Sequence, residues 1–302
     1  MITHPPEETR TNPKPSWLKV AYPSQPGYFE VSAILKNNGL NTICRSAKCP
    51  NTAECWSHRT ATFLILGNVC TRACTFCAVQ KGAPGPLDED EPRRVAEAAA
   101  QLGLAHVVVT SVTRDDLTDG GAAHFARTIQ AVRTRLAGAG IEALIPDFGG
   151  DDGALRIVLR AAPDVLNHNL ETTEAQYPKI NRPAGNYRRS LAVLRTAKAE
   201  GLVTKSGLMI GAGEAEEDLV RTFADLRGAG CDLLTLGQYL QPTRAHAPVV
   251  RYYPPDEFAR LRDIALGFGF AAVESGPLVR SSFHAHTLYD SVKGRKGLPC
   301  DT

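Results

Sequence analysis

Short apolar runs alternate with amphipathic segments along most of the chain. The apolar runs have the length and β-branched content of buried strands, and the amphipathic segments repeat their apolar positions at helical spacing. The predicted strands cover residues 62–66, 106–112, 142–148, 165–171, 204–210 and 233–239, with a short further run at 271–275. The predicted helices cover residues 29–37, 92–102, 122–136, 152–161, 187–200, 214–227 and 255–268.

This alternation predicts an α/β fold. Strand, helix and strand in succession form a parallel βαβ unit, and about six such units predict a partial TIM-like (β/α)6 barrel over residues 61–275. Residues 1–60 are expected to form an N-terminal extension. Its Pro-rich beginning either wraps the surface, anchored by Trp17 and Leu18, or is a partly disordered tail up to Pro15. A Gly-Pro pair stops the last strand, so residues 276–302 are expected to form a C-terminal tail over the barrel mouth.

Composition narrows the class of protein. At 302 residues the chain accommodates one barrel of about 250 residues with extensions. The formal net charge of +2 does not favour nucleic acid or an anionic membrane as a main partner. No apolar run approaches the ~18 residues of a membrane span, and the first residues do not have the pattern of a secretory signal. Most of the eight cysteines lie between Cys44 and Cys77, which indicates metal binding in a reducing cytoplasm rather than disulfides.

The sequence CxxxCxxC follows the first predicted strand directly and consists of Cys70, Cys74 and Cys77. Thiolates this close in sequence can converge on one soft metal centre. A 4Fe–4S cluster normally takes four cysteines, one per iron, so three leave one iron open. A structural zinc site would need a fourth ligand, which is missing nearby. The motif is typical of radical S-adenosylmethionine (SAM) enzymes, in which the open iron binds the amine and carboxylate of SAM.

A second cysteine set, Cys44-x₄-Cys49-x₅-Cys55, lies upstream of the predicted barrel. A proline inside the set predicts an irregular loop folded around a second metal centre. On spacing alone, zinc with His58 as the fourth ligand and an iron–sulfur cluster are equally open. The neighbouring CxxxCxxC motif favours iron.

Polar side chains end the predicted strands, where the chemistry of such barrels gathers. Asn169 and Glu171 alternate along one strand, so both are expected to face the same side. A carboxylate beside an amide suits ribose hydroxyls, and we assign both residues to SAM binding.

Other polar and glycine positions predict structural roles. Lys205 lies at the start of its strand, where a structural ion pair is expected, and His168 is expected to be a hydrogen-bonded barrel histidine rather than a catalytic base. The pattern Gly211-x-Gly213 is not the dinucleotide fingerprint and predicts a strand-to-helix turn. Cys231 is interpreted as a small buried residue, and Cys300 as a free thiol in the tail.

Taken together, these motifs resemble the lipoyl synthase family over about residues 17–285. The resemblance is carried by both cysteine sets and by residues 112–121, 144–148, 168–172, 204–206, 238–240 and the Arg-Ser-Ser-aromatic segment 280–283. This chain has Phe283 where the family usually has tyrosine, a change of little consequence if the ring only packs.

The resemblance implies insertion of two sulfur atoms at carbons 6 and 8 of an octanoyl chain. That chain is attached to a lysine of a lipoyl carrier domain, such as those of 2-oxoacid dehydrogenase E2 subunits and the glycine cleavage H protein. It also implies two 4Fe–4S clusters and SAM, which is cleaved to a 5′-deoxyadenosyl radical. An electron donor such as ferredoxin or flavodoxin, and an iron–sulfur carrier that rebuilds the second cluster, are implied as further partners.

In this resemblance each cysteine set has a separate role. Cys70, Cys74 and Cys77 hold the cluster that binds SAM, and the second set holds an auxiliary cluster that is consumed as the sulfur donor. The fourth ligand of the auxiliary cluster is a serine of the C-terminal motif, which alignment assigns to Ser282, with Ser281 as the alternative. A serine oxygen is a harder ligand than a thiolate, which makes it a suitable place to begin dismantling a cluster.

Two other classes of function remain open from the sequence. One is a different radical SAM enzyme, such as a methylthiotransferase or a biotin-synthase-like sulfur inserter. The upstream cysteine set and the serine motif argue against it. The other is a non-enzymatic iron or zinc module, which would not explain an open-coordination triad at a strand end.

Overall fold

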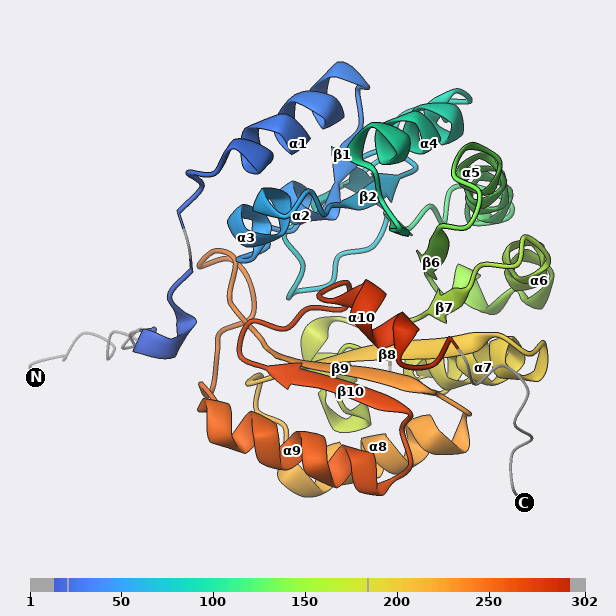
Figure 1. The fold of residues 1–302 in the computed structure, drawn as a ribbon. Helices are drawn as coiled ribbons and strands as arrows, with labels where there is room; N and C mark the ends of the chain where they lie inside the picture. The colour runs from blue at the N-terminus through green and yellow to red at the C-terminus, as the bar shows by residue number, and fades with distance from the viewer. Residues whose placement is uncertain (1–13, 21, 184, 294–302) are drawn as a thin grey trace, which may run out of the picture.

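The computed structural model describes residues 14–20, 22–183 and 185–293, so Cys300 lies outside the described residues. An eight-stranded sheet organises the chain, in the order β1-β2-β5-β6-β7-β8-β9-β10 (Figure 1). β1 pairs antiparallel with β2, and the remaining neighbours pair in parallel. The strands are β1 Asn41–Thr42, β2 Thr62–Ile65, β5 His106–Ser111, β6 Gly140–Leu144, β7 Val165–Asn167, β8 Val203–Ile210, β9 Leu233–Gln238 and β10 Ala272–Gly276.

Helices cover the outer side of this curved sheet (Figure 1). They are α1 Pro26–Asn37, α4 Glu91–Leu102, α5 Ala122–Arg135, α6 Asp152–Arg160, α7 Gly185–Ala199, α8 Glu216–Gly228 and α9 Pro255–Gly267. Short elements complete the fold: α2 Ile43–Ser46, α3 Thr52–Ser57, α10 Ala285–Asp290, the strand pair β3 Val69–Cys70 and β4 Gln80–Lys81, and 3₁₀ turns at Ser16–Leu18, Phe148–Gly150 and Glu174–Ile180. No helix in the described part of the chain is long and apolar enough to cross a membrane.

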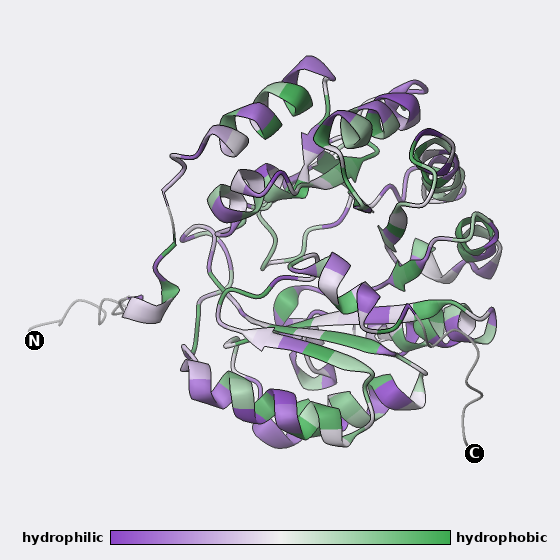
Figure 2. Cartoon of the chain, in the orientation of Figure 1, coloured by the Kyte–Doolittle hydropathy of each residue, from purple (hydrophilic) through white to green (hydrophobic). Residues whose placement is uncertain are grey.

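The hydrophobic pattern of the sequence explains this layering. Helices carry one apolar stripe toward the sheet and a polar outer face, which Figure 2 shows as bands of green and purple. In α6, for example, Leu155, Val158 and Leu159 are buried at helical spacing. Apolar residues of β2, β5 and β6 pack with α1 and α4–α6, and those of β8 and β9 pack with α7–α9. The predicted partial barrel, with its six core strands and their helices, is confirmed.

The C-terminal tail crosses the barrel from one end to the other. Its Arg-Ser-Ser segment lines the cavity at the barrel mouth. α10 then packs Leu288 and Tyr289 against the first residues of three strands, Val165, Val203 and Leu233. These residues mark the end of the barrel opposite the strand ends that carry the polar groups. The tail therefore fills the barrel interior as well as its mouth.

Two local predictions differ from the structure. The sequence predicts a loop over the set Cys44–Cys55, but the short helices α2 and α3 form within it. Thr42 caps α2 by accepting the backbone NH of Cys44 at 3.2 Å. The predicted strand 165–171 ends regular pairing at Asn167, because the register with β8 slips by one residue between the pairs Asn167–Lys205 and Glu171–Leu208. In the N-terminal arm, Leu18 is buried at 6% exposure, whereas Trp17 remains 39% exposed.

Candidate functional site

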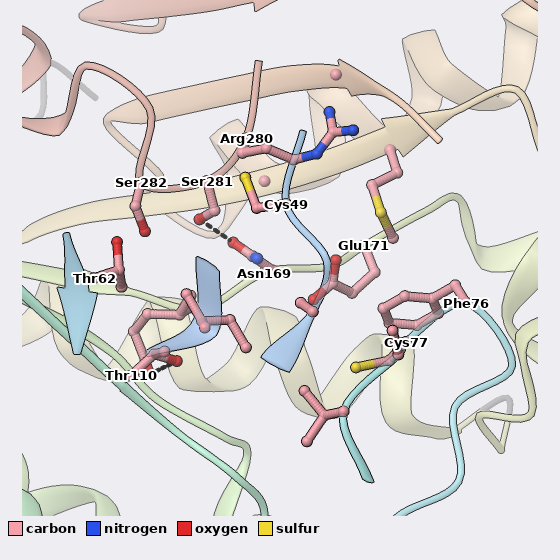
Figure 3. Close-up of a pocket in the computed structure, with 18 of the residues that line it drawn as sticks. Cys49, Thr62, Phe76, Cys77, Thr110, Asn169, Glu171, Arg280, Ser281 and Ser282 are labelled. Atoms are coloured by element: carbon pink, nitrogen blue, oxygen red, sulfur yellow. Dashed lines mark hydrogen bonds between the residues drawn. The ribbon is translucent and has the colours of Figure 1, made fainter. Parts of the chain in front are cut away.

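One cavity of about 540 Å³ collects the polar groups of the barrel mouth, a size typical of small-molecule sites. Both cysteine sets line it, and so do Asn169, Glu171, Arg280, Ser281 and Ser282 (Figure 3). Segments about a hundred residues or more apart thus meet at one place. The two cysteine sets therefore line one cavity, although each set comes from a separate segment of the chain.

Arg72 holds the CxxxCxxC loop to two strand ends. Its guanidinium donates two hydrogen bonds to Asp115, at 2.9 and 2.8 Å, and lies 2.6 Å from a carboxylate oxygen of Asp147. These bonds hold the pKa of the Asp115 carboxyl below its usual value. Charge-assisted, two-pronged contacts of this kind fix geometry as well as adding stability. The residue lies inside the motif, yet nothing in the sequence indicated its partners.

Two further contacts hold the same loop. The backbone NH of Thr113 donates to the Cys70 sulfur at 3.3 Å, and the side chain of Asn181 donates to the carbonyl of Ala73 at 2.9 Å. Burial raises the pKa of the Cys77 thiol to about 11, although a backbone hydrogen bond from Val79 opposes the shift. A soft metal centre would favour the thiolate that burial alone disfavours.

The second cysteine set lies on α2, α3 and their connection. Cys44 is buried, and Cys49 and Cys55 are half-buried. Burial raises the pKa of Cys55 to about 12, and the neighbouring thiols Cys44 and Cys49 contribute to the shift. Asn51, between them, donates to the carbonyl of Leu278 at 2.6 Å and so joins the set to the C-terminal tail.

Arg280 is a cation in the cavity wall beside Cys49. Burial lowers its pKa and the proximity of Cys49 opposes that shift. The guanidinium donates to the carbonyl of Val279 at 2.6 Å, and none of the ion pairs among the described residues involves it. A half-buried cation without a counter-charge is unfavourable. An anionic group held by the three thiols would supply one, so the donor set and its surroundings fit an iron–sulfur cluster.

The two serines of the tail have different surroundings. The Ser281 hydroxyl donates to Asn169 Oδ1 at 2.8 Å and accepts from Asn167 Nδ2 at 2.8 Å. The Ser282 hydroxyl has no hydrogen-bond partner among residues 14–20, 22–183 and 185–293, and in Figure 3 a dashed line joins Ser281, but not Ser282, to Asn169. Only Ser282 of this pair therefore presents an uncommitted oxygen to the cavity.

Asn169 and Glu171 both line the cavity (Figure 3), although they lie beyond the end of β7 rather than on one regular strand. Burial raises the pKa of Glu171, while Arg182 and a hydrogen bond from Asn169 oppose the shift. Burial lowers the pKa of Arg182, but the neighbouring charges of Glu171 and Cys74 outweigh this and raise it. Arg182 is not predicted from the sequence, because its position after a 3₁₀ turn carries no local pattern.

The residues predicted to be structural have structural partners. Lys205 Nζ lies 3.0 Å from both oxygens of Glu142. His168 bonds the Ile145 carbonyl at 2.8 Å and the Ser190 hydroxyl at 2.9 Å, and burial lowers its pKa to about 4, which keeps the imidazole neutral. Gly211 and Gly213 have positive φ values in a strand-to-helix turn, and Cys231 is fully buried.

His58, considered as a zinc ligand, does not line the cavity. Its ring is exposed and lies 2.9 Å from the Glu54 carbonyl. Among the described residues no three or more His, Cys, Asp or Glu side chains form a group that could hold one metal ion. A 4Fe–4S cluster takes one thiolate at each of several irons, so its ligands need not meet at one point.

Comparisons with known proteins agree with this site. The model of the Radical SAM superfamily matches residues 64–226. Lipoyl synthase of Rubrobacter xylanophilus is 54% identical over 282 residues, covering 93% of this chain and 88% of that protein. Lipoyl synthase of Nitratidesulfovibrio vulgaris is 55% identical over 278 residues, covering 92% and 93%. Lipoyl synthase of Caldanaerobacter subterraneus is 54% identical over 283 residues, covering 93% and 99%.

Solved structures share the fold at low identity. The FeFe-hydrogenase maturase HydG from Carboxydothermus hydrogenoformans is 13% identical with a TM-score of 0.52, covering 88% of this chain and 78% of that chain. Streptococcus suis SuiB bound to S-adenosylmethionine is 10% identical with a TM-score of 0.52, covering 72% and 50%. These two likenesses concern the barrel alone.

Proposed function

The chain belongs to the lipoyl synthase family of the radical SAM superfamily, and we propose that the cavity between its two cysteine sets is where the reaction occurs. The enzyme inserts two sulfur atoms into the octanoyl group of lipoyl carrier proteins and uses SAM and two 4Fe–4S clusters. The high sequence identity to lipoyl synthases favours this reaction over methylthio transfer or a biotin-synthase-like insertion. An aliphatic C–H bond has no acidity, so the cofactors, when bound, supply a primary alkyl radical that removes the hydrogen.

We propose that Cys70, Cys74 and Cys77 hold the SAM-binding cluster. The missing local fourth cysteine leaves a coordination position for SAM. Asn169 and Glu171 take the ribose hydroxyls in this proposal. Their shared position on the cavity wall supports the assignment.

Cys44, Cys49, Cys55 and Ser282 are the proposed ligands of the auxiliary cluster. The assignment of Ser282 rather than Ser281 is supported by the hydrogen bonds that already occupy Ser281. Arg280 offsets the negative charge of the bound group. A hydroxyl must lose its proton to ligate iron, which costs more than deprotonating a thiol of pKa about 8.5, so the serine bond is the weakest of the four.

In this proposal the barrel comprises residues 61–275. Two extensions, residues 1–60 and 276–302, flank it and complete its site. The bond between Asn51 and Leu278 supports this division, because it joins the two flanking parts directly. Seven described cysteines are free of disulfides, which fits the cytoplasm in which we place the enzyme.

We propose that the electron donor binds over a second cavity next to Cys74. This cavity of about 390 Å³ is lined by Cys74 and by Arg72, Arg182 and Arg189, with no carboxylate among the described residues of its wall. An acidic protein such as ferredoxin or flavodoxin suits this lining. Arg189→Gln should slow SAM cleavage driven by such a protein but not cleavage driven by dithionite. Equal slowing with both reductants would contradict the assignment.

An iron–sulfur carrier protein is proposed to rebuild the auxiliary cluster after each turnover, because the donor cluster is consumed. The observation that carries the whole proposal is the meeting of two separate cysteine triads in one cavity. Anaerobically purified protein should contain iron and acid-labile sulfide for two clusters. Zinc in place of iron, or iron for one cluster only, would contradict it.

A further inference from the structure

We propose that Ser281 is a positioning residue that couples the SAM site to the auxiliary cluster site. The inference rests on the proposed function and adds a role to a serine that ligates neither cluster. Its hydroxyl binds Asn169, which faces SAM, and its backbone carries the neighbouring Ser282, which faces the auxiliary cluster. Ser281 therefore contacts the SAM site through its side chain and orients a ligand of the auxiliary cluster through its backbone.

The tail is a tight turn at this point. The backbone NH of Phe283 donates to the carbonyl of Arg280 at 2.9 Å, so Ser281 and Ser282 are the two central residues of a four-residue turn. The conformations of adjacent central residues in such a turn depend on one another. A shift of the Ser281 hydroxyl is thus transmitted to the direction of the Ser282 hydroxyl.

A buried network of polar side chains fixes the position of the Ser281 hydroxyl. The Asn167 amide donates to Glu142 Oε1 at 2.7 Å and to the Ser281 hydroxyl at 2.8 Å, which uses both of its hydrogens. Glu142 is in turn paired with Lys205, and Asn167, Glu142 and Lys205 are all fully buried. The Ser281 hydroxyl must then use its own hydrogen for Asn169, as Figure 3 shows.

The donors follow one another in a single direction from the barrel floor to SAM. Asn167 donates to Ser281, and Ser281 donates to Asn169, which lines the same cavity as Glu171. SAM bound at Asn169 would fix the acceptor of Ser281 and hence the turn. By linkage, bound SAM and the auxiliary cluster stabilise each other, because both favour the same turn conformation.

The test measures this coupling without turnover. Holoenzyme with both clusters is exposed to an iron chelator in the absence of a reductant, with and without SAM. Iron loss from Cys49→Ala protein, which lacks the auxiliary cluster, is subtracted to give the auxiliary share. In the wild type, SAM should slow auxiliary iron loss by about fivefold to tenfold, since tenfold corresponds to about 1.4 kcal/mol of coupling.

Ser281→Ala should retain auxiliary iron on purification but lose the effect of SAM on its release. It should also bind SAM about fivefold more weakly, as expected for the loss of one modest hydrogen bond at Asn169. Ser281→Thr keeps the hydroxyl and should restore both properties. This conservative variant separates the bond from a general loss of folding.

Ser275→Ala is the matched control. Its hydroxyl donates to the Phe258 carbonyl at 2.8 Å on the strand that leads into the same tail. It should leave the SAM effect unchanged. Persistence of the effect in Ser281→Ala, or its loss in Ser275→Ala, would overturn the coupling alone. Loss of all auxiliary iron in Ser281→Ala would show that Ser281 is a ligand and would overturn its role as a positioning residue. If the wild-type protein itself contained iron for only one cluster, the proposed function would be overturned as well.

Discussion

Replacing Lys205 by methionine removes the only cation that a fully buried carboxylate contacts closely among the described residues. Lys205 and Glu142 are both 0% exposed, and the ammonium lies 3.0 Å from each carboxylate oxygen. His106 is a weaker neighbour, with Nε2 3.7 Å from the carboxylate. Breaking a buried pair by removing one partner leaves an uncompensated charge and costs about 3–5 kcal/mol.

The stability of the wild type and that of the variant should change in opposite directions with pH. In the wild type, Lys205 lowers the pKa of Glu142 in spite of burial, so the pair contributes stability above the ordinary carboxyl pKa that is lost as the pH falls. In Lys205→Met the carboxyl should become protonated on folding, with a pKa above its usual range. The variant should then lose stability as the pH rises above about 4.5, by up to about 1.4 kcal/mol per pH unit.

The assay is thermal unfolding of anaerobic holoenzyme between pH 5 and 8. A loss of about 3–5 kcal/mol predicts a melting temperature lower by roughly 6–20 °C near neutral pH, with a smaller difference at pH 5. The double variant Lys205→Met/Glu142→Leu removes the charge and should recover most of the loss. A melting temperature for Lys205→Met within about 2 °C of wild type at pH 8, or one independent of pH, would refute the reasoning.

The remaining predictions concern the clusters. Cys74→Ala should abolish SAM cleavage while the auxiliary cluster still assembles, and normal 5′-deoxyadenosine formation, measured by chromatography, would contradict the assignment. Cys49→Ala should cleave SAM without giving a sulfur-containing product, and a lipoyl product at wild-type yield would show another sulfur source. Ser282→Ala should hold the auxiliary cluster weakly, and Ser282→Cys should hold it firmly but release sulfur poorly, both followed by iron content and product mass. Sulfur insertion by Ser282→Cys at the wild-type rate would refute ligand lability as the reason for the serine.

Local chemistry made the cysteine sets and the helices predictable. The CxxxCxxC spacing and the helical stripes are properties of short segments, and the helices begin and end within a few residues of their predicted positions. The structural roles predicted for Lys205 and His168 are confirmed, because a charged or imidazole side chain inside a barrel needs a partner and both have one.

Contacts that depend on the three-dimensional path of the chain were beyond the sequence. Arg72 finds Asp115 and Asp147 across two strand ends, and no pattern links their positions. β7 ends at Asn167 because its register with β8 slips by one residue before Glu171, although the alternation around Glu171 resembles a continuous strand. The choice between Ser281 and Ser282 needed the hydrogen bonds of Asn167, which lies 114 positions from Ser281 along the chain.

The central claim is that the auxiliary cluster at Cys44, Cys49, Cys55 and Ser282 supplies the inserted sulfur. The direct measurement is a single anaerobic turnover with SAM, a reductant and an octanoylated carrier peptide, using enzyme whose clusters were rebuilt with isotopically heavy sulfide. Mass spectrometry of the peptide should find both inserted sulfur atoms heavy, with the auxiliary iron lost in parallel. A lipoyl product that carries only light sulfur, or one that forms while the auxiliary cluster stays intact, would contradict the claim.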